Sequence, residues 1–273
     1  MPSSEAFHAE AYNGGMWTAI TRDVSPSLGG CELSFVPRTE IDVARAAAQH
    51  EDYRRALESL GCRVIVLPAE ADLPDAVFVE DVALVFDEVA VMTRPGAESR
   101  RAEGDSLATV LAAFRPLMSI EAPGTLDGGD VLRIGRDVYV GEAARSNAEG
   151  IAQLRGILSQ FRYSVHAVPT RDCLHLKSAV TLVAEDTLLV NPAWVDAAAF
   201  ADCRLIGIDP SEQHAANALR IGDGVLHPSC FPRTRQRLEA AGIAVTTVDV
   251  SELQKAEGAT TCCSLVFRES AVV

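Results

Sequence analysis

The feature that most constrains this fold is a recurring order of elements: two short strands, a helix and a third strand. Four stretches read as β-hairpins, because each holds two apolar runs separated by a polar turn. These hairpins lie at residues 81–93, 130–141, 179–190 and 218–227. A helical stretch follows each of them, at residues 97–113, 146–160, 194–201 and 233–241. A short strand then follows each helix, at residues 116–120, 163–169, 204–210 and 243–250.

A fifth unit is divided between the two ends of the sequence. It begins with a lone strand at residues 16–22, and continues with a helix at 40–60 and a strand at 62–68. Gly61 is placed to end that helix. The apolar positions that we expect the helix to bury are Ile41, Ala44, Ala48, Leu57 and Leu60.

The stretch after Cys262 reads as a strand without a partner, and the fifth unit lacks its first strand. Pairing the two would close a ring and remove an exposed strand edge. Similar turns at residues 19–27 and 91–99 support this alignment. We therefore predict an α/β fold, a five-bladed propeller of ββαβ units that forms a single domain over residues 1–273. The alternative is an ordinary α/β sheet with hairpins.

Composition and charge narrow the functional class of the 273-residue chain. Its net charge of −14 disfavours nucleic acid and anionic membrane surfaces, since both need clustered Lys and Arg, and is compatible with a cationic small molecule. No apolar run is long enough to cross a membrane, and residues 1–15 lack the features of a signal peptide. The seven scattered cysteines lack paired metal-type spacing. We expect reduced thiols in a cytoplasmic protein.

Polar groups gather in the segment just before each hairpin and before the last strand. If five units surround an axis, these equivalent positions converge near it. The convergent set would join carboxylates, a histidine and a thiol. The segments are Glu80-Asp81, Asp127-Gly128-Gly129-Asp130, His175 to Ser178, His214 to Asn217, and Cys262-Cys263-Ser264.

Such a set has a chemical logic centred on Cys262. A thiolate is a strong nucleophile, but a free cysteine is mostly protonated at neutral pH. A nearby imidazolium or a cationic substrate can stabilise the thiolate, and a histidine can protonate a leaving amine and then deprotonate water. Carboxylates would neutralise a cation, and the donor fork of a guanidinium matches them.

Each candidate also has a purely structural interpretation. Cys262 and Cys263 would face opposite sides of a strand, so at least one of them packs, and a cysteine in an apolar run is more often core than nucleophile. His175 could be a hydrogen-bonded core histidine, and its pairing with Cys173 lacks the second pair of a zinc site. Asp127 could belong to a tight turn. Arg94 and Arg145 could be solvated surface charges. His214 and Asn217 have no evident role.

Five motifs in one order resemble the dimethylarginine dimethylaminohydrolases, a family of the guanidine-modifying penteins. The resemblance spans roughly residues 17–267 and implies the pentein fold, a five-bladed α/β propeller. The motifs are LPDAVFVEDVALV (73–85), TRPGAESRR (93–101), TLDGGDVL (125–132), LHLKS (174–178) and EGATTCCS (257–264).

The resemblance implies roles for individual residues. Cys262 would be the nucleophile, His175 the general acid and base, and Asp127 the group that orients the histidine. Seven further residues would bind substrate: Leu28 as a lid, Asp75, Glu80 and Asp81 at the guanidinium and amino group, Arg94 and Arg145 at the α-carboxylate, and Ala256 through its backbone.

The implied activity is hydrolysis of Nω-methylated arginine to citrulline and an alkylamine, through a covalent cysteine adduct and without metal or cofactor. Glu257, where some relatives carry Asp, and residues 141–147 depart from the family pattern, which puts the exact substrate in question more than the chemistry. The alternatives are an arginine deiminase or amidinotransferase on the same fold, and a non-catalytic pentein that binds a partner. The last would have lost the Cys/His/Asp set. A homodimer is possible.

Overall fold

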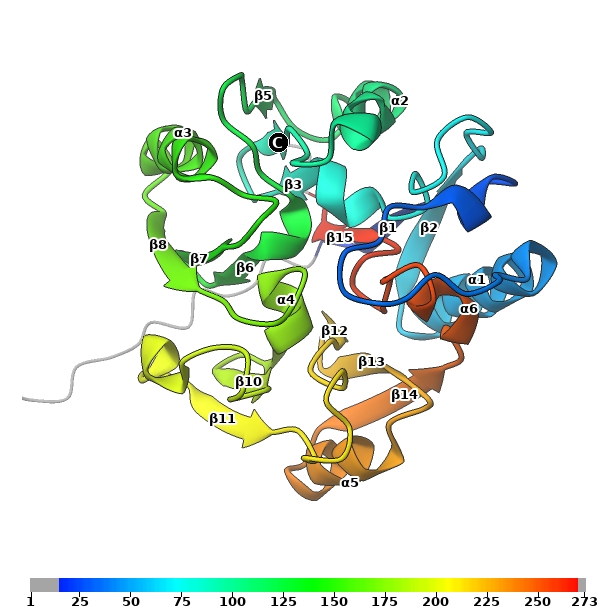
Figure 1. The fold of residues 1–273 in the computed structure, drawn as a ribbon. Coiled ribbons are helices and arrows are strands. Elements are labelled where there is room, and N and C mark those ends of the chain that lie inside the picture. Colours follow the sequence, from blue (N-terminus) through cyan, green and yellow to red (C-terminus); the bar gives the residue numbers. More distant parts are fainter. Residues whose placement is uncertain (1–14, 270–273) are drawn as a thin grey trace, which may run out of the picture.

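Residues 15–269, which the structure describes, form five three-stranded sheets around a common centre in the computed structural model (Figure 1). In each sheet the middle strand pairs antiparallel with one neighbour and parallel with the other. Parallel pairing needs a crossover connection, and the helical stretch of each unit supplies it. The predicted five-bladed α/β propeller is confirmed.

The units follow the predicted order. The first contains β15 (Leu265–Arg268), β1 (Trp17–Arg22), α1 (Val43–Ser59) and β2 (Cys62–Leu67). The second contains β3 (Ala83–Val85), β4 (Ala90–Met92), α2 (Gly104–Leu111) and β5 (Leu117–Ser119). The third contains β6 (Val131–Ile134), β7 (Asp137–Glu142), α3 (Ala148–Ser159) and β8 (Ser164–Pro169). The fourth contains β9 (Val180–Ala184), β10 (Thr187–Val190), the 3₁₀ turn η5 (Ala197–Phe200) and β11 (Arg204–Gly207). The fifth contains β12 (Leu219–Ile221), β13 (Gly224–Pro228), α5 (Pro232–Ala240) and β14 (Ala244–Val248).

The two ends of the chain close the ring as predicted. β15 pairs antiparallel with β1, with Leu265 opposite Ile20 and Arg268 opposite Trp17. The described residues contain five clusters of buried apolar side chains, and each cluster joins neighbouring units. The ring is therefore held by contacts between units, and its helices α1, α2, α3 and α5 lie on the outside (Figure 1).

The buried face of α1 differs from the prediction. The helix begins after Asp42, whose side chain accepts a hydrogen bond from the amide of Arg45. Ala44 and Ala48 are exposed, and the fully buried Tyr53 lies at the centre of the inward face, where its hydroxyl donates to the carbonyl of Thr260 at 2.8 Å. The large aromatic ring, rather than the small alanines, decides which face is buried. The buried residues of the helix are Ala46, Gln49, His50, Tyr53 and Leu57.

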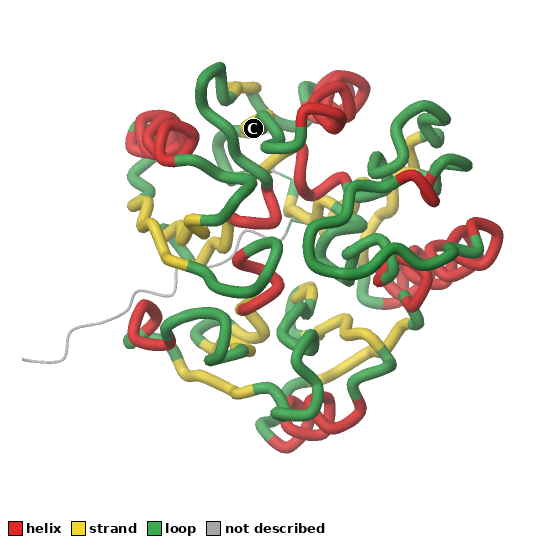
Figure 2. Tube along the Cα trace, in the orientation of Figure 1, coloured by secondary structure: helices red, strands yellow, loops and turns green. Residues whose placement is uncertain are grey.

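Two local predictions need correction. The stretch 194–201 holds only the short turn η5 in place of a helix. Cys262 and Cys263 lie in a turn over residues 260–263, ahead of β15, and not within the strand. Short helical turns also occupy three of the other segments before the hairpins and gather near the centre of the ring (Figure 2): η2 (Val79–Val82), η4 (Gly128–Asp130) and α4 (Leu176–Ala179).

Within the described part of the chain, no helix combines the length and apolar character that crossing a bilayer requires. Residues 1–15, which are predicted to lack signal-peptide features, lie outside the described residues except for Gly15. Four shorter elements complete the described fold: η1 (Leu28–Gly30), η3 (Glu98–Glu103), α6 (Ser251–Gln254) and the turn that carries the two cysteines.

Candidate active site

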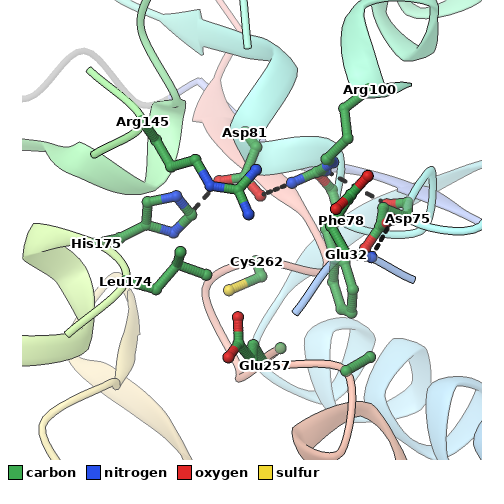
Figure 3. A pocket seen from close by; sticks show the side chains of 12 residues that line it. Glu32, Asp75, Phe78, Asp81, Arg100, Arg145, Leu174, His175, Glu257 and Cys262 are labelled. Atoms are coloured by element: carbon green, nitrogen blue, oxygen red, sulfur yellow. Dashed lines mark hydrogen bonds and ion pairs between the residues drawn. The ribbon is translucent and has the colours of Figure 1, made fainter. Parts of the chain in front are cut away.

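A recess lies where the turns before the hairpins converge. The side chains around it come from several units of the ring (Figure 3). Among the described residues, the structure brings together six of the predicted site residues here: Asp75, Asp81, Arg145, His175, Ala256 and Cys262.

His175 is held between two carboxylates directly before α4. Its Nε2 lies 3.1 Å from Oδ2 of the fully buried Asp127, and its Nδ1 lies 3.8 Å from Oδ1 of Asp81. Gly129 makes this approach possible, since a Cβ there would lie 2.5 Å from Nδ1 of His175 and 2.8 Å from Oδ1 of Asp81. The second glycine of the LDGGD motif is therefore needed at this position, because a side chain there would collide with His175 and Asp81.

The charge of His175 follows from these neighbours. Burial by itself would lower the pKa of the imidazole, but Asp81, Asp127 and Asp130 outweigh it and raise the pKa to about 9. The ring is therefore protonated at neutral pH and can donate a proton.

Cys262 faces the same recess as His175 (Figure 3). Burial, together with the carboxylates of Glu80 and Asp81, raises the pKa of its thiol to about 12, so the sulfur carries its proton at neutral pH. Cys263 is fully buried in the apolar cluster around Tyr53, and its thiol donates to the carbonyl of Ala259 at 3.3 Å. The two adjacent cysteines thus lie in different environments, as expected, although a turn and not a strand separates them.

The carboxylates of Asp75 and Asp81 form the anionic side of the recess. Oδ2 of Asp75 accepts a hydrogen bond from the amide of Glu32 at 3.0 Å. Oδ2 of Asp81 accepts from Arg100 at 2.7 Å, and its Oδ1 accepts from the amide of Gly129 at 3.1 Å. Burial would raise the pKa of Asp81, but the cationic His175 and Arg100 lower it overall. Asp81 therefore remains an anion next to the imidazolium.

Sequence reasoning missed Arg100, which also lines the recess. Its side chain is buried and pairs with Asp81 at 2.7 Å and with Glu103 at 2.8 Å. Burial raises the pKa of Glu103 to about 7 despite this arginine. The i,i+3 spacing of Arg100 and Glu103 was the available signal, but it is also common on exposed helices.

Three predicted substrate-binding residues lie outside the lining of the recess. Leu28 is fully buried in the same apolar cluster as Tyr53. Arg94 donates to the carbonyl of Gly124 at 3.2 Å. Both carboxylate oxygens of Glu80 are engaged, by Lys177 at 2.5 Å and by the hydroxyl of Thr261 at 2.7 Å. Their roles toward substrate stay predictions.

Glu257, which lines the recess, holds the backbone of residues 34–36. The carboxylate of Glu257 accepts hydrogen bonds from the amides of Ser34 at 3.0 Å, Val36 at 2.8 Å and Phe35. Arg145 donates to the hydroxyl of Ser34 at 3.1 Å. Glu257 holds a left-handed backbone with φ of 59°, which is uncommon for a residue with a side chain. The residue noted as a departure from the family pattern therefore both lines the recess and fixes a neighbouring segment.

One group of potential metal ligands occurs in the described part of the chain. The ligand atoms of Asp81, Asp127 and His175 lie within 4.8 Å of one another. A metal would have to displace the proton of His175, whose pKa is about 9, and the Arg100 ion pair of Asp81. The arrangement is better suited to holding a protonated imidazole than a metal ion.

Comparison with known proteins gives a consistent result. Residues 34–204 match the family model described as N,N dimethylarginine dimethylhydrolase, eukaryotic. The N(G),N(G)-dimethylarginine dimethylaminohydrolase of Pseudomonas aeruginosa is 39% identical over 83% of this chain and 90% of its own length. The enzyme of that name from Streptomyces coelicolor is 38% identical over 92% of this chain and 97% of its own. A crystal structure of the P. aeruginosa protein, a cysteine-to-serine variant with citrulline, superposes with a TM-score of 0.89 at 36% identity, covering 92% of this chain and all of that one. The chain belongs to the dimethylarginine dimethylaminohydrolase family.

Proposed function

We propose that this protein hydrolyses Nω-methylated arginine to citrulline and an alkylamine. The observation that carries the proposal is that Cys262 and His175 face one recess, which Asp75, Asp81 and Arg145 also line. The carboxylates suit a guanidinium, and the arginine suits the α-carboxylate of an amino acid. Relatives named for this reaction share more than a third of their residues with this chain.

The first half of the reaction releases the amine. The bound guanidinium, a cation beside the sulfur, lowers the pKa of Cys262, and the thiol proton leaves to solvent. The thiolate attacks the guanidinium carbon and forms a C–S bond. His175 gives its proton to the methylated nitrogen, the C–N bond breaks, and the amine departs. A cationic S-alkylthiouronium and a neutral imidazole remain.

The second half releases citrulline. His175, now neutral, takes a proton from water as the oxygen adds to the same carbon. The C–S bond then breaks, the thiolate is released, and loss of one proton from the product gives the neutral ureido group. Asp127 keeps the imidazole oriented through both halves, since it lies 3.1 Å from Nε2. The walls of the recess contribute positioning of substrate and nucleophile.

Activity is expected to fall as the pH rises through about 9, because His175 must begin the cycle protonated and its pKa is about 9. Asp130 is one of the carboxylates that raise this pKa, and it contacts the amide of Leu176 at 3.0 Å. Asp130→Asn keeps an oxygen for that bond but removes the charge. We expect the alkaline limb of its kcat/KM profile to move to lower pH than in the wild type. An unmoved limb would show that this carboxylate does not act on the reacting histidine.

A substrate comparison tests the proposal directly. Arginine, monomethylarginine and dimethylarginine are supplied separately, and citrulline, ornithine and released amine are measured. We expect citrulline and the alkylamine in equal amounts, with kcat/KM for a methylated substrate above that for arginine. Preferential conversion of arginine to citrulline and ammonia would indicate a deiminase. Ornithine formed only when a second primary amine is supplied as acceptor would indicate amidino transfer. No product from any of the three would support a non-catalytic binding protein.

The single-domain organisation of residues 1–273, the cytoplasmic location and the possible homodimer stay predictions. The net charge of −14 supports a small cationic partner over nucleic acid or an anionic membrane surface.

A further inference from the structure

Asn217 is a buried polar residue at the turn before β12, the position in the fifth unit that corresponds to the site-forming turns of the others. The oxygen of its side chain accepts from the amide of Thr261 at 3.0 Å and from the hydroxyl of Thr260 at 3.0 Å. The nitrogen donates to the hydroxyl of Thr261 at 2.9 Å and to the carbonyl of Lys177 at 3.1 Å. Its amide group is therefore fully used, and every partner belongs to another unit or to the turn that carries Cys262.

The partners of Asn217 adjoin both reacting groups. Thr261 immediately precedes Cys262, and Lys177 lies two residues after His175. The side chain of Asn217 thus connects the backbone of the nucleophile's turn to the backbone that follows the histidine. A loss of either bond would free one of these turns to move relative to the other.

A second set of bonds continues from the same point. The hydroxyl of Thr261 accepts from Asn217 and so directs its own proton to Glu80 at 2.7 Å. The other carboxylate oxygen of Glu80 accepts a hydrogen bond from Nζ of Lys177 at 2.5 Å. Four residues from four different units are joined in this way, and all of them are buried or nearly so. Such a network holds its members in one arrangement only while every bond is made.

We propose that Asn217 is a positioning residue that fixes the placement of Cys262 relative to His175. The proposal rests on the proposed function, because it assumes that these two side chains react with one substrate. Asn217 does not line the recess, so it acts through Thr261 and Lys177. A displacement of about 1 Å at a reacting group can cost about 10²-fold in rate, and this sets the expected effect.

The test compares Asn217→Ala with Asn191→Ala. Asn191 is a matched control, since it is also buried and also bonds to backbone, at the carbonyl of Gln213 (2.9 Å) and the amide of Ala193 (3.0 Å), outside the recess. Three quantities are measured for each: the melting temperature, kcat and KM for dimethylarginine, and the rate at which chloroacetamidine, a guanidine mimic, alkylates Cys262.

Both substitutions are expected to lower the melting temperature, because each leaves buried backbone groups unpaired. Asn217→Ala should in addition lower kcat about 10²-fold, with a smaller change in KM, and slow the alkylation of folded protein. Asn191→Ala should keep kcat and the alkylation rate within about twofold of wild type. Equal kcat losses in the two variants, or a wild-type kcat in Asn217→Ala, would overturn the proposal.

A second pair of variants covers the case in which Asn217→Ala does not fold. Thr261→Val keeps the shape of the side chain but deletes the hydroxyl that Asn217 and Glu80 bind, and Thr261→Ser retains it. We expect the valine to slow alkylation of Cys262 and the serine to restore most of that rate; equal rates would contradict the network. Alkylation of Cys262 needs no natural substrate, so it can be measured even if the proposed function is wrong. If the two Asn variants differ in alkylation rate but the wild type turns over no methylated arginine, the proposed function is rejected and the positioning role stands.

Discussion

Cys262→Ser is expected to lower kcat for dimethylarginine by roughly 10⁴-fold or more, because a hydroxyl is a far weaker nucleophile than a thiolate in the same place. The side chain faces the recess beside His175, so the substitution removes the only atom proposed to form a covalent bond with substrate. The near-identical size of serine should leave the fold and the binding of substrate intact. Citrulline formation and the melting temperature, measured on one preparation, separate these effects.

Cys263→Ser is the matched control, since it makes the same chemical change one residue away. Cys263 is fully buried in an apolar cluster, and its contact with the carbonyl of Ala259 can be kept by a serine hydroxyl. We expect a lower melting temperature and a kcat close to wild type. Normal turnover in Cys262→Ser, or loss of turnover confined to Cys263→Ser, would refute the assignment. Mass analysis after treatment with a haloacetamidine should place the label on Cys262 in the wild type and in Cys263→Ser.

The ring could be predicted because each unit carries its own local signals. The hairpin turns and strand patterns of one unit lie within about forty to seventy residues. The two strands at the ends of the chain each lacked a partner, which predicted that they pair. The inward face of α1 could not be predicted in the same way. Alanines are tolerated on either face, and the choice depends on where Tyr53 finds buried partners in the turn before β15. Those partners are more than two hundred residues away in sequence.

The lining of the recess was predictable where the repeat and the motifs point to a residue by its type and position. Cys262, His175, Asp75, Asp81 and Arg145 were identified from motifs, and they line one recess. Residues that act through partners were not identified. Arg100 becomes part of the site only through its ion pair with Asp81, and Asn217 only through four bonds to other turns. Such contacts depend on rotamers and on the relative placement of units, which no local pattern in the sequence encodes.

His175→Gly is expected to lower turnover of dimethylarginine by roughly 10³-fold or more, since no other group is proposed to protonate the departing amine. A substrate whose leaving group needs no proton separates the two roles proposed for His175, protonation of the leaving amine and activation of water. S-methylthiocitrulline should still alkylate Cys262 in this variant, but the adduct should accumulate because no base activates water, and intact-protein mass should show it.

The control for this variant is a second buried histidine with a different environment. His227 is fully buried, its Nε2 lies 2.9 Å from the carbonyl of Ala215, and burial lowers the pKa of its ring. His227→Gly should lower the melting temperature yet keep kcat per folded molecule, and it should not accumulate an adduct. The opposite signs of the two pKa shifts decide this contrast: His175 holds its proton up to about pH 9, whereas His227 is already neutral where the enzyme is assayed. Wild-type turnover by His175→Gly without added imidazole would show that another group moves the proton, and the reaction sequence would have to be redrawn around it.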